Sequence, residues 1–285
     1  MNTKNKNFSG QYLARRSAAT LVLSALVAVG FTPAGAAPAG YTPDAQVSGA
    51  IGAKYEFGGG ESYYGKPLSS EQTTITRSPG AVFQVFEKGT IYWSEETGAF
   101  FMAGGTAISE EYNEQLVRAG SDPSHPWIGL PTDDGFTAVG GPGKPGFSGQ
   151  HFSDGSIFYN GVTGAHTVHG AIHDLWRFGG VTVASGFPLD NLIPVSDEQP
   201  VGHGARQSFV HPGQGSGNIF WSEATGAHFV ESGVPAGDYY NAHGAVSVFG
   251  FPTSEVQQVG DASVLYTEWG VLTVTASGAV FSPLG

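Results

Sequence analysis

The sequence of 285 residues contains no cysteine, and only 13% of its residues are charged. The lack of cysteine excludes disulfide bonds, a thiol nucleophile and a thiolate metal site. The sequence also lacks a Gly-x-Ser-x-Gly motif, a phosphate-binding loop and a calcium loop of alternating acidic residues. We therefore expect no catalytic residue, no metal and no cofactor.

The N-terminal segment contains no acidic residue. Four basic residues precede an apolar run at 17–31, and the small residues Ala34 and Ala36 follow it. This order predicts a secretory signal peptide over residues 1–36, with an uncleaved N-terminal anchor as the alternative. Residues 37–47 are expected to form a linker. The protein is therefore expected to be secreted, with no membrane span once the signal is removed.

The rest of the chain is acidic and rich in glycine. Beyond residue 36 it carries eight basic and 24 acidic residues, a net charge of −16. Nucleic acids and anionic membranes are poor partners for such a protein. The 44 glycines, together with 12% aromatic residues, are typical of short elements joined by turns.

One eleven-residue pattern occurs three times, as GTIYWSEETGA, GSIFYNGVTGA and GNIFWSEATGA. A Gln-x-Phe element precedes each copy, and the two elements together predict a β-hairpin. A fourth, divergent copy reads VLYTEWGVLTVTASGA, in which Tyr266 is predicted to take the Phe position. The three copies begin at Gly89, Gly155 and Gly217.

A tight turn and a short helix are predicted before each hairpin. The turns read YYGKP, WIGLP, ASGFP and VFGFP, and they end at Pro67, Pro131, Pro188 and Pro252. Upstream of each turn, an apolar residue and an aromatic residue four positions later fall on one helix face. These pairs are Ile51 and Tyr55, Ile108 and Tyr112, Ile172 and Trp176, and Ala236 and Tyr240.

The repeats predict an α+β repeat protein. Each unit would contain a short helix, a Gly-Phe-Pro turn and a β-hairpin, and neighbouring units would bury one another's apolar faces. We expect the units to close into a propeller-like ring. A single repeat domain would cover residues 48–285, with units at 48–103, 104–168, 169–232 and 233–285.

The three spaced elements resemble the LGFP repeat, over nearly all of the chain beyond the signal peptide. The Leu of the family name is replaced here by Tyr64, Ile128, Ser185 and Phe249. The resemblance implies an exported protein of bacteria with mycolate–arabinogalactan walls, where such repeats accompany mycolyltransferases, esterases or amidases and are proposed to hold them to the wall. It implies cell-wall polysaccharide as ligand, other exported wall enzymes as partners, and no catalytic residue.

The paired aromatic residues are candidate sugar contacts. A ring stacks on the C–H face of a neutral sugar while amides and hydroxyls bind its hydroxyl groups. The alternative is that the rings pack between repeats and the glutamines clamp a turn. Neighbouring side chains on a strand face opposite ways, so Trp93 and Trp221 share the face of the buried Ile and are expected to be the more buried rings. The candidates are Tyr92, Trp93, Phe158, Tyr159, Phe220, Trp221, Gln84, Gln150 and Gln207.

Two further residue sets are interpreted as structural. His166, His169 and His173 have spacings that suit a metal, but the first of them fills a position that holds Phe100 in another copy. Acidic residues follow each turn, and their recurrence indicates turn or cap acceptors rather than the two carboxylates of a hydrolase. These acids are Glu71, Asp133, Asp134, Asp190 and Glu255.

The sequence therefore favours a non-catalytic, secreted cell-wall-binding protein, with arabinogalactan favoured on the resemblance alone. One alternative is a secreted wall hydrolase or esterase, for which the insertion in the third unit is the only candidate region. A second alternative is a scaffold that binds another exported protein, which predicts an exposed apolar patch.

Overall fold

The structure is a computed structural model that describes residues 45–73, 78–122, 127–138, 146–211, 213 and 215–284. The predicted signal peptide and most of the predicted linker, up to residue 44, lie outside the described residues. The chain forms two compact units, one of residues 1–99 with 103–105 and one of residues 100–102 with 106–285. Within the described ranges, no helix is both long enough and apolar enough to span a membrane.

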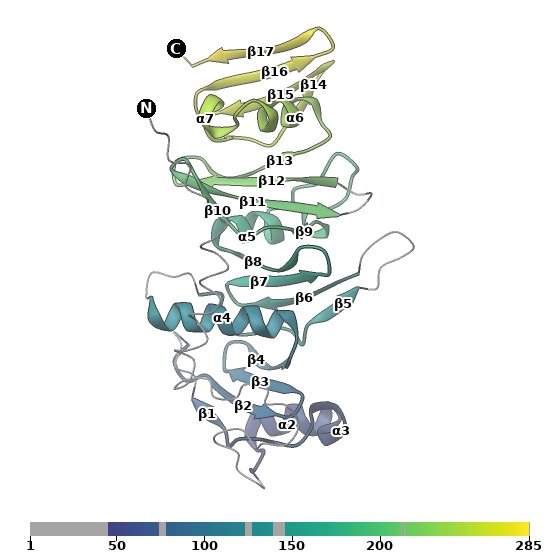
Figure 1. Ribbon diagram of the computed structural model, residues 1–285, viewed down its shortest axis with the longest axis vertical. Coiled ribbons are helices and arrows are strands. Elements are labelled where there is room, and N and C mark those ends of the chain that lie inside the picture. The colour runs from purple at the N-terminus through teal and green to yellow at the C-terminus, as the bar shows by residue number, and fades with distance from the viewer. Residues whose placement is uncertain are drawn as a thin grey trace, which may run out of the picture. The chain divides into compact units, whose positions relative to one another are not determined.

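A helical segment followed by a meander of short strands occurs four times (Figure 1). The first repeat contains α2 (Gly49–Phe57), α3 (Gly60–Tyr64), β1 (Gln72–Thr73), β2 (Val82–Phe86), β3 (Gly89–Ser94) and β4 (Gly98–Ala103). The second contains α4 (Ala107–Ser121), β5 (Phe136–Ala138), β6 (Phe147–Phe152), β7 (Gly155–Asn160) and β8 (Gly164–His169). The third contains α5 (Gly170–Phe178), the 3₁₀-helix η1 (Leu189–Asn191), β9 (Ile193–Pro194), β10 (Gln199–Val201), β11 (Gly204–His211), β12 (Gly215–Ser222) and β13 (Gly226–Glu231). The fourth contains α6 (Pro235–Ala242), α7 (Val246–Phe249), β14 (Gln257–Val259), β15 (Ala262–Thr267), β16 (Gly270–Thr275) and β17 (Gly278–Pro283).

Each repeat forms its own antiparallel sheet, with the strands in chain order. Three sheets have four strands, and the third has five because β9 also pairs with β11. All of these sheets are open in the part of the chain that the structure describes. The repeated helix and hairpin are therefore present, but the predicted propeller-like ring is not confirmed.

An aromatic residue anchors each helix to the turn that follows it, and this residue is fully buried in all but the first repeat. The Tyr112 hydroxyl donates to the Gly129 carbonyl at 3.0 Å, and the Tyr240 hydroxyl donates to the Gly250 carbonyl at 2.8 Å. Tyr55 makes the same bond to Gly65 at 3.2 Å. The predicted pairing of an apolar residue with an aromatic residue therefore describes the buried helix face, and the ring also satisfies a carbonyl of the turn.

The third turn differs from its prediction. Trp176 donates its indole N–H to the carbonyl of Leu192 at 2.8 Å, two residues before Pro194. Pro194 pairs with Phe209, as Pro131 pairs with Phe152 in the second repeat. The predicted Pro188 instead pairs with Thr182. The sequence ASGFP therefore belongs to an insertion that precedes η1, and Pro194 is the equivalent turn residue.

The fourth hairpin also differs from its prediction by one residue. Thr267 lies opposite Gly270, as Phe86 lies opposite Gly89 in the first repeat. Thr267 is buried and Tyr266 is exposed, because successive side chains of a strand point to opposite faces. Thr267 therefore takes the Phe position, and Leu265, two residues earlier, takes the Gln position.

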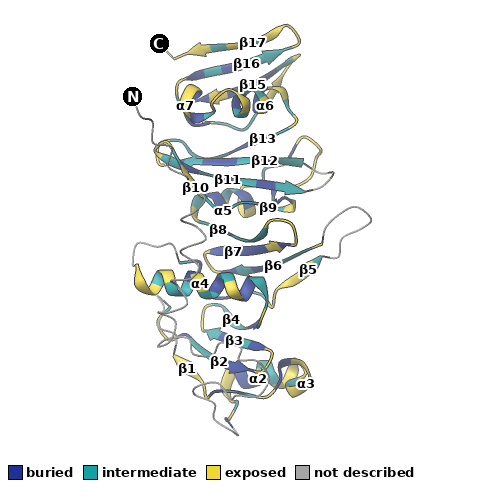
Figure 2. Cartoon of the chain, in the orientation of Figure 1, coloured by how far each residue is buried: buried dark blue, intermediate teal, exposed yellow. Residues whose placement is uncertain are grey.

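Within the second unit, helices fill the space between consecutive sheets. Helix α5 packs on β12 and β13 of its own repeat and on β7 and β8 of the preceding repeat. Ile172 and Trp176 of α5 lie in one buried cluster with Phe158 from the preceding sheet and Phe209 from the following one. Figure 2 shows buried residues along central strands such as β7, and α5 has three buried residues on the side that packs against the sheets. One repeat alone could not bury these residues, so adjacent repeats stabilise each other.

Candidate functional site

The three predicted aromatic pairs lie at the same place in three hairpins. In each hairpin the repeated Gln lies directly opposite the repeated Ile, as Gln150 lies opposite Ile157. The Ile side chains are completely buried. The two aromatic residues that follow each Ile are therefore equivalent positions, and their surroundings are directly comparable.

The first ring of each pair is inside the protein. Phe158 lies 5.2 Å from Trp176 in an edge-to-face arrangement, and Phe220 lies 5.4 Å from Tyr240 in the same arrangement. Tyr92 stacks on Phe83 at 5.9 Å, and burial raises the pKa of its phenol. Tyr92, Phe158 and Phe220 are all more than nine-tenths buried. Their surroundings correspond to the packing alternative, and they present no open face to a sugar.

The second ring of each pair lies nearer the surface. Tyr159 is 37% exposed, and Trp93 and Trp221 are half-buried. The expectation that Trp93 and Trp221 would be the more buried rings is therefore wrong. On the face of the outer ring the strand is fully covered at the Ile and less covered two residues later, so burial of the Ile does not extend along its face to the ring.

Small residues lie directly opposite two of these outer rings on the sheet. Tyr159 lies opposite Ser148 and Ala165, and Trp221 lies opposite Ala205 and Ala227. Side chains directly opposite on an antiparallel sheet are the closest cross-strand neighbours. The repeated Ala after Thr-Gly therefore accommodates a large ring on the adjacent strand.

A local turn fixes the chain directly after each outer ring. The Ser94 hydroxyl accepts a hydrogen bond from the main-chain N–H of Thr97 at 3.0 Å, and Ser222 accepts the same bond from Thr225 at 3.1 Å. In the second repeat, the side-chain oxygen of Asn160 takes this role toward Thr163 at 3.0 Å. The repeated Ser/Asn-x-x-Thr pattern is therefore explained by turn geometry.

The repeated glutamines are buried clamps. Gln150 donates to the carbonyls of Asp133 at 2.8 Å and Phe101 at 3.0 Å. Gln84 donates to the carbonyls of Ser69 at 2.9 Å and Gln46 at 3.2 Å. Both amides, with that of Gln207, are almost fully buried. Their hydrogen-bond donors are therefore used inside the protein, as the turn-clamping alternative requires.

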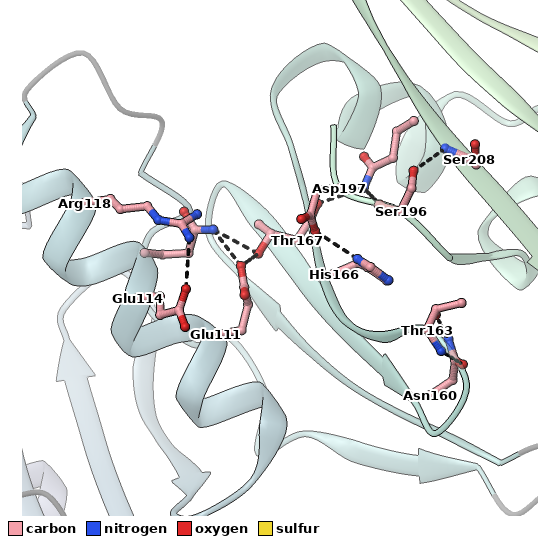
Figure 3. A network of polar contacts seen from close by, with 12 residues as sticks. Glu111, Glu114, Arg118, Asn160, Thr163, His166, Thr167, Ser196, Asp197 and Ser208 are labelled. Atoms are coloured by element: carbon pink, nitrogen blue, oxygen red, sulfur yellow. Dashed lines mark hydrogen bonds and ion pairs between the residues drawn. The ribbon is translucent and has the colours of Figure 1, made fainter. Parts of the chain in front are cut away.

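An acidic residue completes the same junction between repeats. Asp134 accepts the main-chain N–H of Phe101 at 2.8 Å, and Glu255 accepts that of Phe229. In the third repeat, Asp197 occupies this position and lies 2.9 Å from His166 (Figure 3). Asp197 was missed because Pro188 was taken as the turn residue. The signal was a polar pair at the second and third positions after Pro194, as after Pro131 and Pro252.

The other predicted turn acids have separate roles. Asp133 accepts the main-chain N–H of Gly135 at 2.8 Å, which closes its own turn. Asp190 lies 3.6 Å from Arg177 of α5.

The three histidines of the predicted cluster contact different groups. His166 contacts Asp197, His169 lies 3.9 Å from Glu198, and His173 contacts Ser156. Across the described residues, no group of three or more His, Cys, Asp or Glu side chains is placed to hold a metal ion. The histidine spacing therefore reflects separate structural contacts.

Four similar repeats define a tandem-repeat protein. Side chains of one repeat bond to the last strand of the repeat before it. The family model for the LGFP repeat matches residues 65–120, 128–182 and 193–247, which together make up more than half of the chain. The chain therefore belongs to the LGFP repeat family. A search of curated proteins found no match.

Proposed function

We propose that this protein is a non-catalytic, exported protein that binds neutral cell-wall polysaccharide, with arabinogalactan as the favoured ligand. The observation that carries the proposal is the repeated outer ring. Trp93, Tyr159 and Trp221 occupy one position in three repeats, and they are the members of the predicted pairs that reach the surface.

The composition of the chain suits a neutral ligand. Only 13% of the residues are charged, so hydroxyl and amide groups supply much of the polar surface. A flat ring with small neighbours presents one face to the C–H groups of a sugar. Three weak sites of about 4 kcal/mol each, about millimolar in affinity, would act together on a repeating polymer through effective concentration.

The test is co-sedimentation of residues 37–285 with mycolate-free cell walls, and with the same walls stripped of arabinogalactan to peptidoglycan. The proposal expects binding to the first preparation and not to the second. Replacing all three outer rings, Trp93→Ala, Tyr159→Ala and Trp221→Ala, should weaken binding by at least about tenfold. Phe57→Ala is the matched control, because Phe57 is an exposed aromatic residue outside the repeated position.

The remaining outcomes separate the alternatives. Equal binding to both walls would make peptidoglycan the ligand, and binding to neither would favour a protein partner. Release of sugar from either wall would support the hydrolase alternative. If the triple variant unfolds, Tyr159→Ala alone and the change in tryptophan fluorescence of the unaltered protein with soluble arabinogalactan fragments test the same surface.

A further inference from the structure

Two imidazoles share one serine hydroxyl between the second and third repeats. His151 Nδ1 of β6 lies 2.8 Å from Ser156 Oγ of β7, and the same oxygen lies 3.0 Å from His173 Nε2 of α5. Ser156 is completely buried and His173 is 4% exposed. This chain of side chains connects the sheet of the second repeat to the helix of the third.

The Ser156 hydroxyl has one proton, so it can donate a hydrogen bond to only one of the two imidazoles. This limits how many protons the two imidazoles can take up together. With neutral imidazoles, Ser156 donates to one ring and accepts from the N–H of the other. One protonated ring is still accommodated, because it donates to the hydroxyl oxygen while the hydroxyl donates to the second ring. When both rings are protonated, both donate, and the buried hydroxyl proton of Ser156 has no acceptor. Two adjacent positive charges then lie between the repeats.

The surrounding charges do not compensate for a second proton. His173 is faced by Asp174, Arg177 and His169 in addition to His151. His151 is faced by Arg177, Asp133 and Asp190. Burial is the largest cause that lowers the pKa of His173, to about 4, and Asp174 only partly opposes it. Burial also lowers the pKa of His151 below its ordinary value of 6.5.

The next junction in the chain has a similar connection without a titratable group. Ser208 and Asn218 occupy the positions of His151 and Ser156, with the hydroxyl of Ser208 2.6 Å from Asn218 Oδ1. The amide of Asn218 donates to Asn241 of α6 at 3.3 Å. This junction also joins a sheet to the helix of the following repeat, and its hydroxyl and amide groups stay uncharged as the pH changes.

We propose that the junction between the second and third repeats is an acid-sensitive joint, in which protonation of His151 and His173 breaks the connection through Ser156 and loosens helix α5 from the preceding sheet. Both groups favour the neutral form in the folded protein. Their contribution to stability is therefore present above pH 6.5 and is lost as the pH falls from 6.5 toward about 4.

The first measurement is hydrogen exchange of α5 and α6 at about pH 7.5 and about pH 5, corrected for the intrinsic exchange rate. The proposal expects α5 to lose protection by at least about tenfold relative to α6. Equal loss in both helices would overturn it. A nuclear magnetic resonance titration of the unaltered protein supplies a second test, and two imidazoles that titrate independently near 6.5 would also overturn it.

The variant test removes the titratable groups and retains hydrogen-bonding side chains. The double variant His151→Gln, His173→Gln should keep α5 as protected at about pH 5 as at about pH 7.5. Asn241→Ala is the matched control, because it weakens the other junction without altering a titratable group. If the double variant does not fold, the titration and the exchange measurement on the unaltered protein decide the proposal by themselves.

Discussion

The side-chain amide of Gln207 donates a hydrogen bond to the main-chain carbonyl of Thr167 at 2.9 Å and joins the third repeat to the last strand of the second. Its other N–H donates to the carbonyl of Ser196 at 2.9 Å, within the turn of its own repeat. One side chain therefore fixes both a turn and the contact between two repeats. This explains why Gln recurs at a position that the sequence also suggests as a sugar contact.

Replacing Gln207 by Leu should lower the free energy of unfolding by about 1–3 kcal/mol, because the buried carbonyl of Thr167 and the partly buried carbonyl of Ser196 each lose a hydrogen bond. Leu occupies this position in the fourth repeat, at Leu265, so its size is compatible with the fold. Urea unfolding measures the change. The control Gln258→Ala alters an exposed Gln and should stay within about 0.5 kcal/mol. A Gln207 variant as stable as this control would show that the clamp contributes nothing.

The anchor between helix α6 and its turn gives a second prediction. Tyr240→Phe removes the hydroxyl that bonds to the Gly250 carbonyl at 2.8 Å and should cost about 1 kcal/mol. Tyr239→Phe is the neighbouring control, because the Tyr239 side chain is half-buried and stacks on His243 through its ring. Thermal and urea unfolding of both variants compare the two hydroxyls. Equal losses of stability in the two variants would mean that the bond to Gly250 stabilises the protein no more than the hydroxyl of Tyr239 does.

The sequence predicted the repeated unit because its signals are local. An apolar residue and an aromatic residue on one helix face, a turn with Pro, and two short strands all depend on residues close together in the chain. The third turn was predicted at the wrong residues because ASGFP contains the expected Gly-Phe-Pro sequence. The hydrogen bond of Trp176 to Leu192, which identifies the equivalent turn, is visible only in the folded chain.

The accessible side of the candidate site could not be predicted from the strand pattern. Alternation assigns Ile157 and Tyr159 to one face and Phe158 to the other. In the folded protein Trp176, from the next repeat, covers Phe158, so the ring predicted to face outward is buried. This covering depends on how neighbouring repeats pack, which no local pattern records.

A third prediction concerns the pH dependence of His228, which lies 3.3 Å from Glu255. The hydrogen bond to Glu255 raises the pKa of His228 above 6.5, although burial lowers it. For Glu255, burial raises the pKa, but hydrogen bonds from His228 and main-chain groups outweigh it and hold the pKa below 4.5. The His228 contribution to stability is therefore complete below pH 6.5 and is lost as the pH rises through its folded pKa. The Glu255 contribution is present above pH 4.5 and is lost as the pH falls through its folded pKa.

Glu255→Gln should reverse the direction of the His228 shift, because burial remains and the carboxylate is gone. A nuclear magnetic resonance titration should then place the pKa of His228 below 6.5. Asp261→Asn, at an exposed turn, removes one negative charge elsewhere and should leave the His228 titration unchanged. If the pKa of His228 stayed above 6.5 in Glu255→Gln, the carboxylate would not be its cause.

The last prediction concerns the first glycine of each repeated G-x-I sequence. A Cβ on Gly217 would lie 2.5 Å from both the Val230 carbonyl and the Phe229 ring, and a Cβ on Gly155 would lie 2.8 Å from the Val168 carbonyl. The close approach of the last strand therefore excludes a side chain at this position. Gly217→Ala should cost about 1–3 kcal/mol, because the neighbouring main chain must move. Gly161→Ala, where a Cβ meets no atom within 4 Å, should leave urea unfolding within about 0.5 kcal/mol of the unaltered protein. Equal stability of the two variants would mean that the strand spacing relaxes freely and that another cause retains the glycine.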